Sequence, residues 1–550
     1  MNATVAVALV VGVLVLALPR WFARTRDTLG VYRALRERRK ARHVNWSAIA
    51  AYDERVAAAP EEDRLSERVW RDLDLAQVFL SVDYTASEPG RQTLYHRLRR
   101  PATAAEPVMR LDAVARALSR DPATADAARR ALARLSDHRA SGLEALMFGE
   151  VPRRPALWWC FPLLTLGAFA CLALIAVWPR LVLGWLAVCA VNVVVQVTYK
   201  PRVRAYVPAL HELPGFLAAA RELGTLRMPG LADEVQSLRE GAAQLGSLRL
   251  ATRWLMFEPG QANDLAASLY EYVNLLFLLD VNAFVFSTNA LRTHAPLLRR
   301  MFEALGTIDV AQSVATWRAT LPTWSTPEFT PPAKALQAEG VYHPLLADPV
   351  PNTIAIDGGG VLITGSNMSG KTTFVRALGV NAVLAQSLAT ACASAWRAPL
   401  LRVRTSITGG DSLADGKSYY LAEIESVLAL VRAKEGGRQH LFLLDELFRG
   451  TNTTERVAAA YAVLAHLDQG LDITVVATHD LELLGLLRGT YALQHFTETV
   501  AGDDLTFTYR IRPGPSTTRN AIALLKVMQY PEAIVARAMA LVDGHGGPAT

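Results

Sequence analysis

Gly360-Val-Leu-Ile-Thr-Gly-Ser-Asn-Met-Ser-Gly-Lys-Thr-Thr373 joins a short apolar run to a complete GxxxxGK[ST] pattern. The apolar run predicts a buried strand, and the pattern after it is a Walker A loop that opens a helix. Its glycines let successive backbone N–H groups point at phosphates, at the positive end of the helix. We therefore predict an α/β P-loop NTPase domain with ATP as its ligand and Mg²⁺ as its metal.

The loop supplies most of the predicted nucleotide-binding residues. The Lys371 ammonium is expected to reach the β- and γ-phosphates and to assist catalysis, and the Thr372 hydroxyl is expected to ligate Mg²⁺. The residues expected to hold the nucleotide are Gly365, Ser366, Asn367, Met368, Ser369, Gly370, Lys371, Thr372 and Thr373.

Two further apolar runs end in polar residues that suit phosphoryl transfer. The segment 440–446 reads HLFLLDE, a Walker B strand, so Asp445 is expected to hold Mg²⁺ and Glu446 to orient or deprotonate the attacking water. The strand predicted at 472–478 delivers His479 at its C-terminal end, where α/β sheets place ligands. We expect His479 to contact the γ-phosphate during catalysis.

Apolar residues make up 51% of the 550-residue chain, and the mean hydropathy is +0.18, which favours membrane spans. The uncharged run 3–19 predicts an anchor, with a cleaved signal peptide as the alternative. The run 157–199, interrupted at 178–180, predicts a hairpin of two spans, with a buried hairpin of a soluble protein as the alternative. Basic residues beside each run predict a multi-pass cell-membrane protein with its N-terminus outside and its ATPase domain cytoplasmic.

The remaining chain before the P-loop shows apolar residues at helical spacing and predicts an all-α core. Residues 269–290 carry acidic and amide side chains, so we expect a core helix of the soluble part there rather than a fourth span. A Pro- and Thr-rich stretch at 321–332 predicts a linker. The expected organisation is an anchor at 1–20, a helical segment at 21–152, the hairpin at 153–200, a second helical segment at 201–325 and the ATPase domain at 326–550.

Charge and cysteine usage leave the partner open. The net charge of +6 and the pI of about 9.1 suit either nucleic acid or anionic lipid headgroups. The four cysteines form no spacing typical of a disulfide framework or a metal site.

The segments ITGSNMSGKTTF, LLDELFRGTNT and ATHD resemble the ATPase domain of the MutS family of DNA mismatch-repair proteins. The stretch 411–423, DSLADGKSYYLAE, is similar to the signature that this family carries between Walker A and Walker B. The resemblance implies that Ser418 reaches the ATP of a neighbouring subunit, so that a homodimer shares two composite sites. His343, Pro344 and Asn352 are similar to a segment that flanks the nucleotide in the family, which makes Asn352 a further binding candidate.

The resemblance extends in front of the ATPase domain. Residues 82–91, 110–114 and 305–313 look like parts of the family's helical core. A mismatch-reading domain is not recognisable, so we expect a membrane-anchored relative without mismatch recognition that acts on DNA or on a DNA-processing partner. Ser369 and Ser406 replace the Gly and Arg that are usual in the family.

Two other functions fit parts of the sequence. A half-transporter would also join membrane helices to a P-loop domain, but such proteins carry an LSGGQ-like signature and about six spans in one block. An ATP-gated scaffold with negligible turnover would keep the binding loop, although Lys371, Asp445 and Glu446 together favour hydrolysis.

Overall fold

The computed structural model describes residues 44–56, 63–136, 142–149, 155–204, 207–245, 264–366, 369–407, 419–434, 438–501, 504–515, 525 and 530–544. Two compact units alternate along the chain. Unit 1 comprises Met1–Ala59, Asp83–His96 and Ala113–Thr316, and unit 2 comprises Pro60–Val82, Arg97–Asp112 and Trp317–Thr550. The expected anchor at 1–20 lies outside the described residues.

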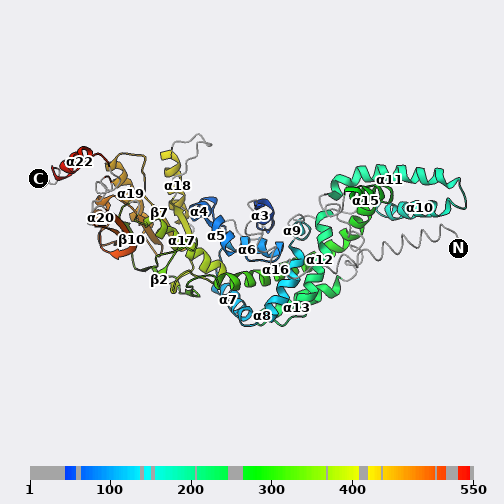
Figure 1. Ribbon diagram of the computed structural model, residues 1–550, viewed down its shortest axis with the longest axis horizontal. Coiled ribbons are helices and arrows are strands. Elements are labelled where there is room, and N and C mark those ends of the chain that lie inside the picture. Colours follow the sequence, from blue (N-terminus) through cyan, green and yellow to red (C-terminus); the bar gives the residue numbers. More distant parts are fainter. Residues whose placement is uncertain are drawn as a thin grey trace. The chain divides into compact units, whose positions relative to one another are not determined.

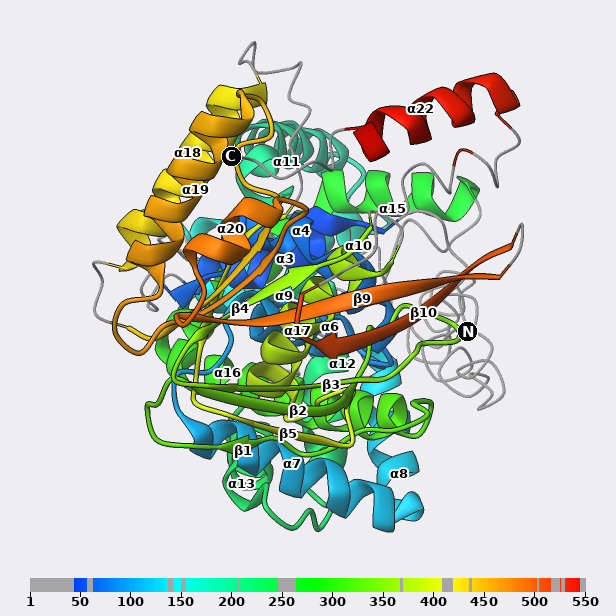
Figure 2. The same cartoon turned by 90° about the vertical axis from the view of Figure 1, so that its left-hand side faces the viewer.

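Unit 2 contains a six-stranded sheet, whose strands are β4 (Gly360–Thr364), β6 (Arg402–Ser406), β7 (His440–Asp445), β8 (Ile473–Ala477), β9 (Tyr491–Ala501) and β10 (Asp504–Pro513). Their order is β10-β9-β4-β8-β7-β6, and all neighbouring pairs are parallel except β9 with β10. Every residue of β4, β7 and β8 is buried, as expected for parallel strands covered on both faces. Figure 2 shows β9 and β10 as a long hairpin at one edge.

A second sheet of four strands has the order β1-β5-β2-β3 and comprises β1 (Glu328–Phe329), β2 (Ala335–Val341), β3 (Asn352–Asp357) and β5 (Ala395–Ala398). The stretch predicted as a linker at 321–332 therefore contributes a short strand, β1, which pairs with β5. Helix α17 (Lys371–Leu388) contacts strands of both sheets, and nearly all of its side chains are buried. The P-loop helix is thus the central helix of unit 2.

The remaining described helices of unit 2 are α4 (Glu67–Asp72), α5 (Leu75–Val82), α18 (Tyr419–Lys434), α19 (Thr453–Leu467), α20 (Leu481–Leu486) and α22 (Glu532–Gly544). Helix α7 (Ala105–Arg120) begins in this unit. The α4 carboxylate Asp72 accepts hydrogen bonds from Thr405 Oγ1 at 2.8 Å and Ile407 N at 3.1 Å, at the end of β6. Unit 2 therefore incorporates N-terminal segments that lie far ahead of the domain start predicted at residue 326.

Unit 1 is helical, and its described elements are α3 (Trp46–Arg55), α6 (Glu88–Arg99, up to His96), α8 (Pro122–Leu132), η2 (Ala133–Leu135), α9 (Leu143–Phe148), α10 (Cys160–Leu174), α11 (Leu181–Arg204), α12 (Val207–Leu223), α13 (Ala232–Gln244), α15 (Asp264–Phe277) and α16 (Leu279–Arg318, up to Thr316). A buried carboxylate fixes the start of α6. Asp309 accepts hydrogen bonds from Ala86 N, Ser87 N and Ser87 Oγ at 2.6 to 3.2 Å. Burial raises the pKa of Asp309 to about 6, although these donors act in the opposite direction.

Helices α10 and α11 pack against each other as a hairpin, as the sequence predicts (Figure 1). Only α11, over Leu181–Tyr199, is both long and apolar enough to cross a membrane among the described helices, with a mean hydropathy of 2.1. Helix α10 has 15 residues and reaches only about 22 Å, which is less than the roughly 30 Å of a bilayer core. The prediction of three spans is therefore not met: one described helix qualifies, and the first expected span lies outside the described residues.

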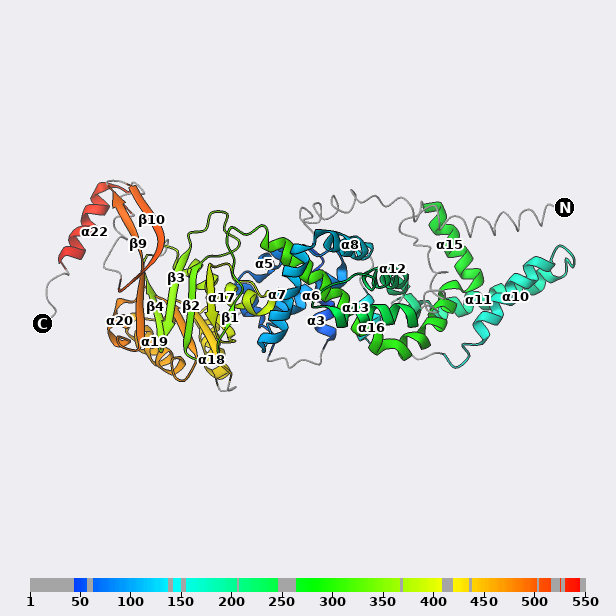
Figure 3. The same ribbon diagram turned by 90° about the horizontal axis from the view of Figure 1, so that it is seen from below.

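The single core helix predicted at 269–290 is in fact two helices. Helices α15 and α16 meet at Leu278, whose φ of 53° lies in the left-handed region and breaks the helical path. Helix α15 contacts both arms of the α10–α11 hairpin, and it lies beside the base of α11 in two perpendicular views (Figures 1 and 3). We call residues 274–282 the elbow.

Candidate functional site

The strand register brings the predicted site residues together. Ile363 of β4 and Asp445 of β7 are both paired with Ala477 of β8, so the C-terminal ends of three adjacent strands lie side by side. The P-loop follows β4, Glu446 follows β7, and His479 follows β8 by two residues. The sheet therefore forms the site that the sequence motifs indicate.

The described part of the P-loop is shaped by two glycines with positive φ, 134° at Gly365 and 103° at Gly370. A Cβ atom on Gly365 would lie 2.8 Å from Phe496 O, so a larger residue does not fit there. Lys371 is buried, and its ammonium donates to Gly365 O at 2.6 Å and Ser366 O at 2.8 Å. The lysine charge thus lies inside the loop, at the N-terminus of α17.

Thr372 and Asp445 form the predicted metal pair. Thr372 Oγ1 donates to Asp445 Oδ2 at 2.6 Å, while the buried Asp445 Oδ1 has no hydrogen-bond partner among the described residues. Burial raises the pKa of Asp445, and the hydrogen bond from Thr372 opposes that rise. A hydroxyl and a carboxylate with a free buried oxygen are hard oxygen ligands that suit Mg²⁺, so these two residues fit the ion.

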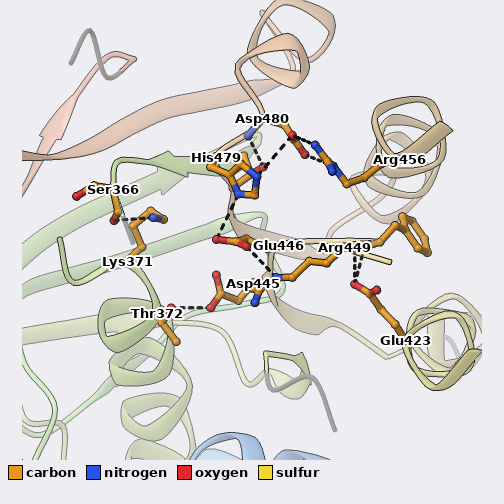
Figure 4. A network of polar contacts seen from close by, with 12 residues as sticks. Ser366, Lys371, Thr372, Glu423, Asp445, Glu446, Arg449, Arg456, His479 and Asp480 are labelled. Carbon is orange, nitrogen blue, oxygen red and sulfur yellow. Dashed lines mark hydrogen bonds and ion pairs between the residues drawn. The ribbon is translucent and has the colours of Figure 1, made fainter. Parts of the chain in front are cut away.

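Glu446 lies in a tight turn after β7. Its φ is 52° and that of Phe448 is 59°, so two non-glycine residues within three positions adopt the left-handed conformation. Such backbone is uncommon and concentrates at functional sites. The carboxylate lies 2.8 Å from Arg449 Nε and 3.4 Å from His479 Nδ1 (Figure 4). The contact with His479 is the main cause that lowers the pKa of Glu446, so this contact favours the ionised carboxylate.

His479 is half exposed beside this carboxylate, and its contact with Glu446 raises the imidazole pKa. The next residue, Asp480, pairs with Arg456 of α19 through two contacts of 2.6 and 3.0 Å. Figure 4 shows Arg456, Asp480, His479, Glu446 and Arg449 as one continuous chain of charged groups. Sequence reasoning gave no role to Arg456, which lies outside the quoted motifs, or to Asp480, the last residue of ATHD.

Helix α18 connects to the Glu446 turn through Glu423. Its Oε1 accepts hydrogen bonds from Phe448 N at 2.5 Å and Arg449 N at 3.3 Å (Figure 4). Burial raises the pKa of Glu423, and the two backbone donors act against it. Helix α18 begins inside the predicted signature stretch 411–423, and through Glu423, the last residue of that stretch, it holds the backbone of the strained turn.

Asn352, a predicted nucleotide-binding residue, bonds to the backbone of β10. Its amide nitrogen donates to Tyr509 O at 2.9 Å, and its amide oxygen accepts from Ile511 N at 2.8 Å. These bonds hold the irregular part of β10, where the pairing with β9 shifts between Phe507 and Ile511. The Tyr509 ring, 45% exposed, consequently lies against the P-loop, 3.3 Å from where a Cβ on Gly370 would be. No sequence motif indicates Tyr509, because it reaches the P-loop through the irregular pairing of β10 with β9.

Three predicted site residues lie outside the described residues: Asn367, Met368 and Ser418. Their proposed roles stay predictions. Thr373 follows Thr372 in the first turn of α17.

Comparison with known proteins gives the family. Residues 361–544 match the sequence model of MutS domain V. The DNA mismatch repair protein MutS of Thermus aquaticus is 34% identical over 212 residues, which are 38% of this chain and 26% of that protein. The DNA mismatch repair protein MutS 2 of Halobacterium salinarum is 32% identical over 285 residues, 50% of this chain and 32% of that protein. The chain is a MutS-family protein.

This MutS-family chain covers only about a quarter to a third of the length of these relatives, for example 34% of the Thermus thermophilus MutS, with which it is 30% identical. The match to domain V assigns residues 361–544 to an ATPase family, which supports ATP binding and hydrolysis as the general activity. The matched range contains the P-loop, Asp445, Glu446 and His479.

Both serines that depart from the MutS pattern make local hydrogen bonds. Ser369 Oγ donates to Ser366 O at 2.8 Å inside the P-loop, and Ser426 Oγ donates to Ser406 Oγ at 3.0 Å between α18 and β6. The hydroxyl of Ser369 thus takes part in closing a loop for which the family ordinarily uses glycine.

Proposed function

We propose that this chain hydrolyses ATP at the P-loop of unit 2 and couples turnover to the pairing of two subunits. The observation that carries the proposal is the convergence of Lys371, the Thr372–Asp445 pair and Glu446 at the ends of adjacent strands. Glu446 would take a proton from water as its oxygen attacks the γ-phosphorus, and the bond to the β–γ bridging oxygen would break to release ADP.

Mg²⁺ would be held by Thr372 and Asp445, where it would neutralise charge on the β- and γ-phosphates. Lys371 would exchange its contacts with the loop carbonyls of Gly365 and Ser366 for contacts with phosphate oxygens. His479, beside Glu446, would contact the γ-phosphate. Each role requires only that a side chain exchange one partner for another at its present position.

Phosphate release by the full-length protein in detergent tests the proposal. We expect Glu446→Gln to lower kcat by about 10²- to 10⁴-fold, the usual contribution of a general base, while the Kd for ATP changes little. Glu482→Gln, at an acidic residue outside the proposed site in α20, is the matched control and should keep wild-type turnover. Tight ATP binding without turnover in the wild type would instead favour an ATP-gated scaffold.

The composite site rests on the signature resemblance around Ser418 and on the MutS relatives. We propose that Ser418 of one subunit completes the site of a second copy, so that the active form is a homodimer. Glu423, the last residue of the signature stretch, holds the backbone beside Glu446 and so connects the signature to the base of its own site. ATP bound between two copies would then contact the signature of one copy and lie beside the base of the other.

We also propose that the α10–α11 hairpin inserts into a lipid bilayer. Its outward side chains are apolar, with 71% of Leu183, 66% of Val194 and 63% of Leu166 exposed. Exposed apolar surface of this extent is unfavourable in water, at roughly 25 cal/mol for each Å². Basic residues on both sequence flanks, such as Arg154 and Arg202, would keep the two ends of the hairpin on the cytoplasmic side.

DNA is the partner class suggested by the names of the relatives, which are DNA mismatch repair proteins. The net charge of +6 agrees with phosphate binding. Titration of the detergent-solubilised protein with duplex, branched and single-stranded DNA at low and high salt tests this part. Affinity that falls with salt would support it, and a flat response up to micromolar protein would exclude it.

A further inference from the structure

The helical bundle around the hairpin buries amide side chains among apolar ones and exposes large apolar side chains. Asn192, Asn274 and Gln196 are 0%, 3% and 4% exposed. Large apolar residues of the same bundle, such as Leu183, lie at its surface. A helical bundle in water buries its apolar faces and exposes polar ones. This bundle instead exposes apolar side chains and buries amides, which matches surroundings of hydrocarbon rather than water.

Buried polar side chains of the hairpin donate hydrogen bonds to backbone carbonyls at the helix break in the elbow. The C-terminal carbonyls of α15 lack partners within the helix. Asn192 Nδ2 of α11 donates to Leu276 O at 2.6 Å, and Thr165 Oγ1 of α10 donates to Phe277 O at 2.8 Å. Both arms of the hairpin therefore cap the same helix end.

The start of α16 is capped by Asn274 of α15 and is joined to the hairpin by Asn282. Asp280 N donates to Asn274 Oδ1 at 2.9 Å, and Asn282 Nδ2 donates to Thr165 Oγ1 at 2.8 Å and to Leu278 O at 3.0 Å. A helix break is tolerated in lipid only where neighbouring side chains satisfy the freed backbone groups. The elbow meets this condition through contacts with the hairpin.

The contacts also set a depth for the elbow along the hairpin. Phe277 stacks on Phe169 with ring centroids 4.1 Å apart. Thr165 and Phe169 lie five and nine residues after Cys160, the first residue of α10, or roughly 8 and 14 Å along the helix. Half of a bilayer core is about 15 Å thick. If the hairpin is inserted, the elbow that packs at these levels is also below the membrane surface.

We propose that the elbow enters the cytoplasmic leaflet with the hairpin and that lipid acyl chains cover their shared apolar surface. The inference rests on the membrane part of the proposed function and revises our expectation that residues 269–290 belong to the soluble part. The elbow enters and leaves on one side, so the ATPase domain stays cytoplasmic. Asn192 and Thr165 join the end of α15 to the hairpin, and Asn282 joins the start of α16 to it, which makes the hairpin more than a separate anchor.

Quenching by brominated lipid tests the depth of the elbow in the full-length protein. Single cysteines labelled with the fluorophore NBD would replace Leu275 in α15, Val194 in the hairpin and Thr293 in α16, in a background without the four native cysteines. The reconstituted vesicles contain phosphatidylcholine and phosphatidylglycerol, with or without bromine on the acyl chains. We expect emission to fall at least about twofold at positions 275 and 194 and to stay constant at 293, some 21 Å along α16 from Leu279.

Quenching at 194 without quenching at 275 would overturn the elbow proposal and leave the inserted hairpin intact. Absence of quenching at both positions would overturn both proposals, and quenching at 293 would contradict the shallow elbow. A second test removes the caps with Asn192→Leu and Asn282→Leu, which should abolish quenching at 275 and preserve it at 194. Thr198→Val is the matched control, because Thr198 Oγ1 bonds only within its own helix, to Val194 O.

Discussion

At the scale of single residues, the site is defined by side chains that hold one another in place. Lys371 is bonded to loop carbonyls, Thr372 to Asp445, and Glu446 lies between Arg449 and His479. The sequence motifs predict Lys371, Thr372, Asp445 and Glu446, because each has a fixed place at the end of a strand. The motifs contain nothing that indicates Tyr509, which reaches the loop only through an irregular strand.

We expect Tyr509 to stack on the adenine of ATP, because its exposed ring lies against Gly370 at the start of α17. Tyr509→Ala should raise the Kd for ATP about fivefold, from a loss of roughly 1 kcal/mol of stacking. Tyr509→Phe keeps the ring and should bind ATP normally. Calorimetric titration measures both, with tripolyphosphate as a ligand that has no base. An equal loss of tripolyphosphate affinity in Tyr509→Ala would show loop damage instead of lost stacking.

The pKa of Asp309, which burial raises to about 6 from the ordinary aspartate value of about 3.9, predicts a pH-dependent stability. The folded state holds this proton more tightly, so the contribution of Asp309 favours folding below about pH 4 and is lost as the pH rises to about 6. The loss amounts to roughly 3 kcal/mol. The side chain of the Asp309→Asn variant cannot ionise. The free energy of unfolding of this variant should therefore lack this part of its dependence on pH.

Thermal unfolding of the wild type and of Asp309→Asn between pH 4 and 7 measures the difference between their stabilities. The contributions of the other titrating groups are common to both proteins and cancel in this difference. Parallel curves for the wild type and Asp309→Asn would mean that Asp309 stays ionised in the folded protein, held by Ala86 and Ser87.

At the scale of elements, α17 is positioned by close packing around Gly379. A Cβ atom there would lie 2.6 Å from Leu443 Cδ1 and 2.7 Å from Leu73 Cδ2, which belong to β7 and to the segment between α4 and α5. The pattern of strands predicts the contact with β7. It does not predict Leu73, because helices distant in sequence carry no signal of which sheet they join.

Gly379→Leu should therefore overpack this contact and destabilise the protein by about 1–3 kcal/mol. Gly485→Ala in α20 is the control, because a Cβ there meets no atom within 4 Å, and its melting temperature should stay the same or rise slightly. Differential scanning calorimetry in one detergent compares the two. An unchanged melting temperature in Gly379→Leu would mean that the packing around α17 is looser than described.

At the scale of the whole molecule, the amino-acid pattern predicts a P-loop domain with helical segments before it, and the domain V match agrees with that. Two features depend on long-range contacts that no local pattern encodes. Unit 2 takes in residues 63–82 through contacts such as that of Asp72 with Thr405, and the elbow at Leu278 exists because hairpin side chains cap it. The hydropathy of the hairpin was clear from the sequence, but the shortness of α10 was not.

The central claim is that ATP is hydrolysed in a site shared by two copies of the chain. Mixing Lys371→Ala and Ser418→Ala proteins, each inactive alone, tests it most directly. Random pairing places one intact loop opposite one intact Ser418 in half of the dimers, so phosphate release should recover to about a quarter of the wild-type rate. A mixture no more active than the two variants measured separately would contradict the shared site.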